Sequence, residues 1–492
     1  MKARHVPWMV IAIFEAATLI GCGGSGSTPT PPAGDFSLSV SPSSLFVPIG
    51  VSSGSLQVSV QAVNGFSQAV SLSLSGLPAD VTTVPASPFN VSPGTNQTVV
   101  FSAASGVTPS VSSITVQGVA GTLSHNGTLS LSVAAAVYNY VAAASPNDIY
   151  GFAADANTGA LTAVPGSPFS LSNGPIDFVA APETGGDFLY SLTETTAGGT
   201  DIATLSTFLV DPASGTLTVG PTITYPPNTY QNDLAVSPNG KFLYVAQQSC
   251  ILAYLIDPAT GNLTQSSCSS VPAQPYQGGF VVMPPGNFAY SVNTDGLVID
   301  IYGYSVNQSD GSLTVVQSIV PFSAQPGRLF SDPQGHALYL ITNSTAFICG
   351  ITDIFSADPT TGALTLLNTS FGPTSCMPNS ITFDPGDHFG YVSSRAGTLS
   401  GSGGIYAGLV DPTSGNLTNV TGSPFFAQAF PDFGSVEPSQ SKFLFEAIAS
   451  SSLQVTAYAI DPNSGALSST SVTEGPLGES NPVKMVIVQP PH

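Results

Sequence analysis

Positive charge is scarce in this chain. Its 492 residues include 7 Lys and Arg but 28 Asp and Glu, which gives a formal net charge of −21. Two of the cations, Lys2 and Arg4, lie at the N-terminus, and the other five are spread over the rest of the chain. Proteins that bind DNA or RNA cluster several Lys and Arg side chains to neutralise phosphates. Nucleic acid is therefore excluded as a partner, and the acidity favours solubility outside the cytoplasm.

Long runs of helix-forming residues are also missing, and only 7% of the residues are charged. The chain consists instead of Val, Thr, Ser, Tyr and Phe, interrupted by 50 Gly and 42 Pro. This composition is typical of β-rich proteins. The hydrophobic fraction of 42% is enough for a large core. We therefore expect an all-β fold rather than a disordered chain.

The N-terminus has the pattern of an export signal. Residues 1–22 combine basic Lys2 and Arg4 with an apolar stretch that is too short to span a membrane. The stretch ends in Leu-Ile-Gly-Cys22, which resembles the lipobox of bacterial lipoproteins, where the Cys thiol is lipidated. The alternative is a plain secretory signal with a chance Cys. Lipidation would anchor the chain in the cell envelope, and Gly23 after the Cys favours the outer membrane, on its periplasmic or surface face.

Residues 23–35 are rich in Gly, Ser and Pro and predict a flexible tether. From Phe36 to Ala134, apolar residues alternate with polar ones in short runs separated by turn signals such as Asn64-Gly65. About seven strands in about 100 residues predict an immunoglobulin-like β-sandwich. The segment resembles Cys-free immunoglobulin-like modules of bacterial surface proteins. A spacer role is the expectation for it, with carbohydrate or protein binding as the alternative.

Residues 135–492 contain one motif seven times. Its consensus is Asp-Pro-x-Ser/Thr-Gly-x-Leu-Thr, in which Asp caps a hairpin turn, Pro presets φ and Gly takes the left-handed position. A strand-rich unit that recurs about every 50 residues predicts a β-propeller. The motif glycines are Gly159, Gly215, Gly261, Gly311, Gly362, Gly415 and Gly465.

A second motif, an aromatic pair Phe-x-Tyr that follows two spaced prolines, falls between these hairpins. Each unit is thus predicted to have two inner strands joined at Phe-x-Tyr and two outer strands joined at the Asp-Pro turn. The C-terminal residues 481–490 match an inner strand but lack their aromatic partner, which stands at Tyr138-Asn-Tyr140. We therefore expect seven four-stranded blades, one of which takes its innermost strand from the C-terminus.

Four cysteines follow Cys22. Cys250 and Cys268 are placed symmetrically about one Asp-Pro turn, seven residues before Asp257 and seven after Gly261, which predicts a disulfide across that hairpin. Cys349 and Cys376 flank the turn at Gly362 less evenly, and a second bridge is expected there. A metal site at either pair is the less favoured alternative, because no His lies near them in the sequence.

The repeat resembles the lactonase-like family of seven-bladed propellers, which includes 6-phosphogluconolactonases. In that family an inner strand reads Gly-Pro-Arg-His-x-x-Phe-His-Pro, and a Glu follows the aromatic of the next strand. The resemblance implies an active site made of the Arg, the His and the Glu. Here Glu194 matches the Glu, but the Arg-His pair is absent from all seven inner strands. No His is placed to act as a general base near neutral pH.

Alignment of the inner strands on their second proline defines a ring of residues at the channel mouth. A second ring lies four residues after each Phe-x-Tyr aromatic and contains Glu194 and Arg395. The ligand-binding candidates from the two rings are Asp177, Asp233, Arg328, Lys484, Glu194 and Arg395, of which Glu194, Arg328 and Arg395 are also the catalytic candidates. The alternative is structural, with Lys484 and Asp177 paired between neighbouring blades.

The leading hypothesis is an envelope-anchored lactonase-like propeller lipoprotein that binds a ligand or acts as a scaffold without catalysis. A glycan, a small molecule or an envelope protein would be its partner. The alternative is an extracytoplasmic lactonase acting on a sugar lactone, and a third hypothesis is a structural component of an envelope assembly. The sequence indicates no cofactor. It also indicates no metal, because the Asp-rich turns lack the spacing of calcium loops.

Overall fold

The computed structural model describes most of the chain beyond the N-terminal segment. The described residues are 33–49, 52–104, 107–108, 110–134, 137–154, 159, 161–181, 188–197, 199–212, 214–272, 275–294, 299–322, 327–342, 352–371, 377–395, 403–425, 431–438, 441–448, 454–474 and 482–489. The expected signal peptide, Cys22, Cys349 and Cys376 lie outside these residues. In the described part, no helix has the length and apolarity needed to cross a bilayer.

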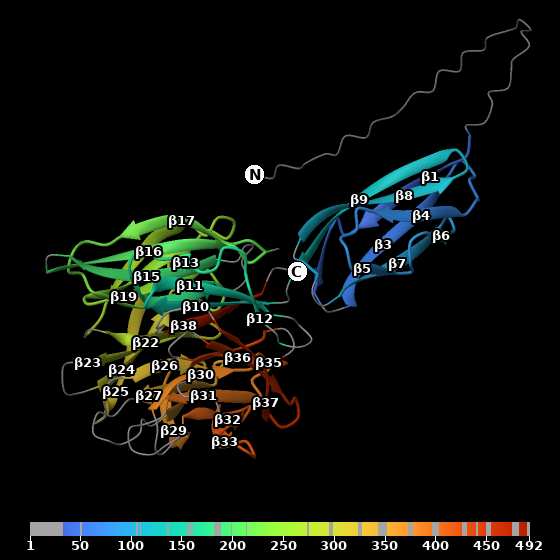
Figure 1. Cartoon of the computed structure of the whole chain (residues 1–492). Helices are drawn as coiled ribbons and strands as arrows, with labels where there is room; N and C mark the ends of the chain where they lie inside the picture. The colour runs from blue at the N-terminus through green and yellow to red at the C-terminus, as the bar shows by residue number, and fades with distance from the viewer. Residues whose placement is uncertain are drawn as a thin grey trace, which may run out of the picture.

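The first nine strands form two sheets (Figure 1). One sheet has the order β1-β3-β7-β5 and the other β2-β9-β8-β4-β6, with β2 parallel to β9. The apolar residues predicted to face inward, such as Val58, Leu72 and Val116, are buried in one core. The strand count is nine rather than the expected seven, because short strands also form beside the turns. The strands are β1 Asp35–Ser41, β2 Ser44–Pro48, β3 Ser52–Val63, β4 Val70–Ser75, β5 Val81–Val84, β6 Phe89–Val91, β7 Thr95–Ala103, β8 Ser110–Ala120 and β9 Leu123–Ala134.

The remaining strands form seven sheets, which we number as blades 1 to 7 in chain order. Blade 1 comprises β10 Val137–Ala144, β11 Asn147–Ala154, β12 Leu161–Ala163, the short β13 Phe169–Ser170 and the C-terminal β38 Pro482–Val488. Blade 2 comprises β14 Gly174–Ala181, β15 Phe188–Ala197, β16 Thr200–Val210 and β17 Leu217–Thr224. Blade 3 comprises β18 Gln231–Val236, β19 Phe242–Gln247, β20 Cys250–Ile256 and β21 Leu263–Ser270.

Blades 4 to 7 repeat the same antiparallel order. Blade 4 comprises β22 Pro275–Met283, β23 Phe288–Thr294, β24 Ile299–Val306 and β25 Leu313–Phe322. Blade 5 comprises β26 Gly327–Ser331, β27 Ala337–Thr342, β28 Thr352–Ala357 and β29 Leu364–Phe371. Blade 6 comprises β30 Met377–Phe383, β31 Phe389–Arg395, β32 Gly404–Val410 and β33 Leu417–Asn419, and blade 7 comprises β34 Pro431–Val436, β35 Phe443–Ile448, β36 Gln454–Ile460 and β37 Leu467–Glu474.

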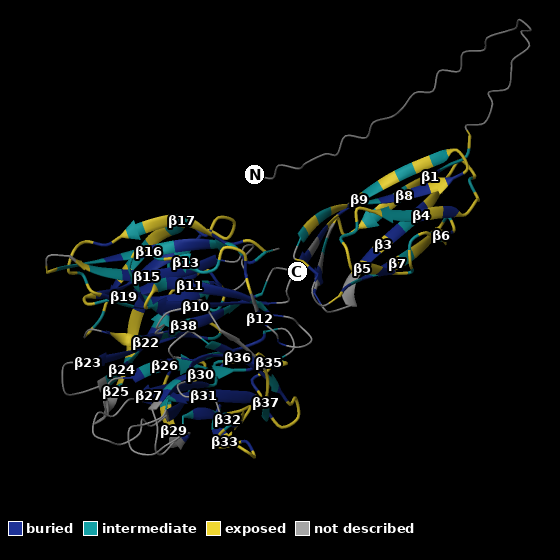
Figure 2. Ribbon diagram, in the orientation of Figure 1, coloured by how far each residue is buried: buried dark blue, intermediate teal, exposed yellow. Residues whose placement is uncertain are grey.

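The C-terminal strand closes the ring as the sequence predicts. β38 pairs antiparallel with β10, with Tyr140 opposite Val486, so blade 1 takes its innermost strand from the C-terminus. This arrangement hydrogen-bonds the two ends of the propeller to each other and removes a free sheet edge. The inner strands of the blades are more deeply buried than the outer ones. β10 and β31 are almost entirely buried, whereas the outermost strand β17 is largely exposed (Figure 2).

The Asp-Pro turns have the expected conformation. In blade 3, the side chain of Asp257 accepts hydrogen bonds from the backbone N–H of Ala259 and Thr260, and the Gly261 N–H donates to the Asp257 carbonyl at 2.8 Å. All seven motif glycines have φ between 68° and 72°. This left-handed conformation is costly for any residue with a Cβ.

Each motif glycine also contacts the aromatic motif of the preceding blade. An added Cβ on Gly261 would lie 2.4 Å from the ring of Phe188, so only a hydrogen fits between the two blades. We call these seven pairs the glycine–aromatic contacts, although one partner is Ala337. They are Gly159–Phe443, Gly215–Tyr138, Gly261–Phe188, Gly311–Phe242, Gly362–Phe288, Gly415–Ala337 and Gly465–Phe389.

The tyrosine of the aromatic motif adds a hydrogen bond to the same contact. The Tyr190 hydroxyl donates to the Gly261 carbonyl at 2.9 Å, between blades 2 and 3. Four further blade pairs have the equivalent bond, at 2.5 to 3.2 Å. At the junction between blades 7 and 1 the equivalent residue is Phe445, which has no hydroxyl. The glycine of the Asp-Pro turn and the aromatic pair of the second motif therefore form the two sides of one contact between neighbouring blades.

The expected disulfide between Cys250 and Cys268 is present, with Cα atoms 5.8 Å apart. It joins β20 to β21 across the outer hairpin of blade 3. The bond closes a short loop and constrains the unfolded chain, which contributes about 3 kcal/mol in the chain-entropy model.

Substitution of Gly261 tests the glycine–aromatic contacts. We expect Gly261→Ala to lower the free energy of unfolding of the propeller by about 3 kcal/mol, because the left-handed backbone costs about 1 kcal/mol and overpacking against Phe188 adds roughly 2. Gly199→Ala is the matched control, since Gly199 also has a positive φ but has open space around it; about 1 kcal/mol is expected there. Chemical denaturation measures both, and equal losses would contradict a packing role.

Candidate functional site

The innermost strands of all seven blades surround a central cavity of about 360 Å³. Its walls come from β14, β18, β22, β26, β30, β34 and β38, and both polar and apolar side chains line it. A cavity of this size is at the lower end of the range found for small-molecule sites. The four ring candidates from the sequence, Asp177, Asp233, Arg328 and Lys484, all line this cavity.

A repeated irregularity of the inner strands directs the ring residues toward the cavity. In blades 2, 3, 6 and 7 a β-bulge lies directly before the ring residue, namely Asp177, Asp233, Ser380 and Phe433. A bulge adds one residue to a strand and re-aims the side chains beside it. The spaced prolines of the sequence motif therefore mark the position where each inner strand turns a side chain toward the channel.

Asp177 connects three blades. Its Oδ1 accepts a hydrogen bond from Lys484 Nζ of blade 1 at 2.8 Å, and its Oδ2 accepts one from the Leu234 N–H of blade 3 at 2.8 Å. Asp233 repeats the second contact, since its Oδ2 accepts from the Phe280 N–H of blade 4 at 2.7 Å. The pairing of Lys484 with Asp177 considered from the sequence is thus present. The two carboxyl groups fix the spacing of neighbouring inner strands.

The pKa values of the two buried carboxyl groups are shifted in opposite directions. Burial opposes ionisation of Asp177, but the Lys484 charge and hydrogen bonds from Asp233, Lys484 and the Leu234 N–H outweigh it, so the pKa of Asp177 lies below its usual value. Burial, together with the negative charge of Asp177, raises the pKa of Asp233 well above its usual value. The Lys484 charge therefore favours the ionised form of Asp177, whereas burial beside Asp177 favours the protonated form of Asp233.

Arg328 extends along the channel from blade 5. Its stem lies against Gly278 of blade 4, where an added Cβ would come within 2.7 Å of Arg328 Cγ. Its guanidinium carbon lies 5.0 Å from the centre of the Phe433 ring of blade 7, a cation–π contact. Toward the described residues the guanidinium makes no hydrogen bond. Burial lowers the pKa of Arg328, while the carboxylates of Asp177, Asp233 and Asp432 oppose that shift, and an arginine stays charged at neutral pH.

Arg395 is held by a residue that was not among the site candidates. Its Nε donates to Oδ1 of Asp432, which is fully buried and also accepts from Asn379 Nδ2 at 3.1 Å. Asp432 directly precedes Phe433, which lines the cavity. Burial raises the pKa of Asp432, and the bond and charge of Arg395 partly offset the effect.

Glu194 does not reach the central cavity. It pairs with Gly174 in the register of β14 and β15, beyond the bulge, and does not line the cavity. Burial and the nearby charge of Asp201 raise its pKa. The structure therefore brings Asp177, Asp233, Arg328 and Lys484 together, places Arg395 next to them through Asp432, and leaves Glu194 apart.

Sequence reasoning also missed a second buried carboxyl group, Glu446 on β35. It is fully buried and accepts a hydrogen bond from Ser393 Oγ at 2.9 Å. Burial raises its pKa well above the usual value, the Ser393 bond lowers it and the Asp432 charge raises it further. Glu446 follows the aromatic pair of blade 7 directly, and no spacing rule distinguishes it from a surface Glu.

Most polar groups at the cavity already have partners within the protein. The carboxylates of Asp177 and Asp233 already accept backbone N–H groups, and none of the described residues that line the cavity is a histidine. Lys484 and Arg395 each face a carboxylate. Of the residues that line the cavity, Arg328 has guanidinium donors without a hydrogen-bond acceptor among the described residues, and these donors can bind a ligand.

The arrangement of seven blades, six with four strands and blade 1 with an additional short strand, around a central cavity defines a seven-bladed β-propeller. Residues 140–302 match the model of the family described as lactonase, 7-bladed beta-propeller. This match confirms the resemblance to lactonase-like propellers that the two motifs predict.

Solved structures with the same fold cover 72% of this chain. A candidate 6-phosphogluconolactonase from Bacteroides fragilis NCTC 9343 is 19% identical, with a TM-score of 0.55 over 98% of that chain. One from Bacteroides uniformis ATCC 8492 is 21% identical, with a TM-score of 0.54 over 99%. A protein from Lactobacillus plantarum is 18% identical, with a TM-score of 0.52 over 99%. At these identities the likeness shows the fold alone, and no curated protein matches the chain.

The raised pKa of Asp233 predicts how stability depends on pH. Unfolded Asp has a pKa of about 3.9, so above that pH the folded chain holds a proton that the unfolded chain releases. Stability therefore falls as pH rises from about 4 through the folded pKa. The free energy of unfolding should therefore decrease less between about pH 5 and about pH 8 in Asp233→Asn than in the wild type. Urea unfolding at each pH measures this free energy.

Asp257→Asn is the matched control for this measurement, because Asp257 lies in an exposed turn and Asn307 occupies the equivalent position in blade 4. It should keep the pH dependence of the wild type. A wild-type slope in Asp233→Asn would contradict a protonated Asp233.

Proposed function

We propose that this protein is a ligand-binding propeller without catalytic activity, and that the ligand is a small oxygen-rich molecule such as a saccharide unit. The observation that carries the proposal is Arg328. Its guanidinium lines the central cavity, lies over Phe433 and has no hydrogen-bond acceptor among the described residues. Saccharide hydroxyl groups supply such acceptors, and a buried Arg binds oxygen ligands through a planar set of donors.

The charges of the cavity favour an uncharged ligand over a phosphorylated one. Lys484 is neutralised by Asp177, and Arg395 beside the cavity by Asp432. A phosphate needs cations that are not already committed. Arg328 alone, surrounded by the carboxyl groups of Asp177, Asp233 and Asp432, offers little net positive charge.

Lactone hydrolysis is the second candidate function, because the family match and two fold neighbours point to it. It would require a base that activates water or a nucleophile. Glu194 corresponds to the Glu of the family motif, yet it lies away from the cavity lining, and burial raises the pKa of Asp233, which makes it a poor source of a carboxylate base. The geometry therefore supports binding better than hydrolysis.

One set of variants tests both functions. We expect calorimetry on the full chain with neutral and phosphorylated saccharides to detect binding of a neutral one. Arg328→Met keeps an apolar side chain over Phe433 and should weaken that binding at least about tenfold, since hydrogen bonds to a charged group contribute about 1.5–3 kcal/mol. Lys241→Met is the control, because Lys241 is an exposed cation in the turn between β18 and β19. It should bind the saccharide with the affinity of the wild type.

The same proteins are then assayed on lactones, including 6-phosphogluconolactone. No hydrolysis above the spontaneous rate is expected. Turnover by the wild type that disappears in Glu194→Gln would replace the binding proposal with a lactonase. A preference for phosphorylated saccharides, or binding that Arg328→Met leaves intact, would show that the cavity charges do not select the ligand.

We also propose that the chain is exported and anchored in the cell envelope through lipid on Cys22, with residues 23–35 as a tether. The support is the lipobox-like sequence and the very low content of cations. Metabolic labelling with palmitate in a bacterial host should label the wild type and Cys349→Ser but not Cys22→Ser, and only labelled chains should sediment with membranes. An unlabelled wild type would leave Cys22 as an ordinary residue of a secretory signal.

A further inference from the structure

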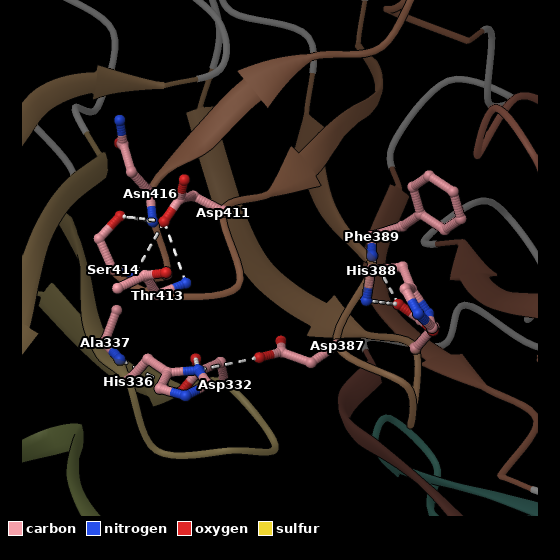
Figure 3. Close-up of polar contacts among 12 residues, drawn as sticks. Asp332, His336, Ala337, Asp387, His388, Phe389, Asp411, Thr413, Ser414 and Asn416 are labelled. Carbon is pink, nitrogen blue, oxygen red and sulfur yellow. Dashed lines mark hydrogen bonds and ion pairs between the residues drawn. The ribbon is translucent and has the colours of Figure 1, made fainter.

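Two neighbouring turns bring three potential metal ligands close together (Figure 3), and none of the three lines the central cavity. Asp332 and His336 belong to the turn between β26 and β27 of blade 5, and Asp387 belongs to the equivalent turn between β30 and β31 of blade 6. One ligand atom from each side chain lies within 4.8 Å of the other two. The cluster therefore bridges two blades.

The distances within the cluster suit a bound ion better than a hydrogen bond. His336 Nδ1 lies 3.4 Å from Asp332 Oδ2 and 3.4 Å from Asp387 Oδ2. Both distances are longer than the usual range for N–H···O bonds, about 2.7–3.2 Å, and the two carboxyl oxygens share one ring nitrogen. Ligand distances of about 2.0–2.2 Å around a tetrahedral zinc ion place neighbouring ligand atoms about 3.4 Å apart.

The two carboxyl groups are buried without sufficient partners. Asp332 is fully buried and Asp387 is 6% exposed. Asp332 Oδ2 and Asp387 Oδ1 accept no hydrogen bond from the described residues. Buried carboxylates are normally hydrogen-bonded, paired with a cation or bound to a metal. The unpartnered oxygens are thus a second observation, independent of the clustering, that points to a cation.

The equivalent turn of blade 6 also contains an Asp and a His, but there the Asp carboxylate has several backbone hydrogen-bond donors. Asp384 and His388 have the same four-residue spacing as Asp332 and His336. The Asp384 carboxylate, however, accepts the N–H groups of Gly386, His388 and Phe389. The His388 side chain is 71% exposed, compared with 35% for His336.

We propose that Asp332, His336 and Asp387 bind one divalent transition-metal ion, with Zn²⁺ as the ion whose coordination fits best, and that the ion cross-links blades 5 and 6. One imidazole and two carboxylates form a mixed nitrogen and oxygen set, which suits zinc, whereas Ca²⁺ and Mg²⁺ bind six or more oxygens. Three protein ligands leave one tetrahedral position for water. His336 also lines a cavity of about 320 Å³, which gives an ion a path to the site.

The test uses the full chain without an affinity tag, stripped of metal with a chelator. We expect titration with Zn²⁺ to give one ion bound per chain and to raise the melting temperature. Co²⁺ in place of Zn²⁺ should give the visible absorption bands of a tetrahedral site. His336→Gln and Asp387→Asn should each bind Zn²⁺ at least about tenfold more weakly and show no rise in melting temperature, although both should melt cooperatively in the chelator.

His388→Gln is the matched control, because it removes a His at the same turn position in the next blade. It should bind one Zn²⁺ with the affinity of the wild type. A wild type that binds no Zn²⁺, or variants at His336 and Asp387 that bind it as the wild type does, would overturn the proposal. Loss of binding in His388→Gln equal to that in His336→Gln would overturn it as well, because the ion would then not be held by the described cluster.

Discussion

The close contact between a glycine of one blade and an aromatic ring of the preceding blade is the constraint on which the propeller depends. Each blade is a small sheet that cannot bury both faces alone, so it must pack against two neighbours. At the Gly261–Phe188 contact only a hydrogen atom separates the two blades. A motif glycine makes the equivalent close contact at all seven junctions, six times with an aromatic ring and once with Ala337, and one of them, Gly159 with Phe443, lies where the first and last blades meet. Because the ring is closed, no blade can shift without breaking two such contacts.

The few cations of the chain are placed where buried carboxyl groups need them. Arg328, Arg395 and Lys484 are three of the five that follow the N-terminal segment, and all three lie in or beside the central channel. Asp177 and Asp233 hold adjacent inner strands together by accepting backbone N–H groups, and Lys484 offsets the cost of burying Asp177. The channel thus combines structural carboxyl groups with one guanidinium that lines the cavity without a hydrogen-bond acceptor among the described residues.

Much of the fold could be predicted from the sequence because it follows from local chemistry that repeats. The Asp-Pro turn needs Gly at a left-handed position, the aromatic pair marks the second strand, and the missing partner of residues 481–490 indicates how the ring closes. The prolines of the inner strands also identified Asp177, Asp233, Arg328 and Lys484 as channel residues. Glu194 was predicted at the mouth from the family motif, but the bulge between Pro175 and Asp177 leaves it beyond the cavity lining.

The sequence by itself determined the blades, their strand order, the disulfide between Cys250 and Cys268, and the residues that face the channel. Only the tertiary structure decided which of those residues meet. Lys484 and Asp177 are 307 residues apart, Arg395 and Asp432 belong to different blades, and His336 and Asp387 are separated by 51 residues. Turn and strand signals act over a few residues, whereas ion pairs and metal ligands depend on how whole blades pack. The charge state of Asp233 and the cluster of Asp332, His336 and Asp387 therefore had no counterpart in any sequence motif.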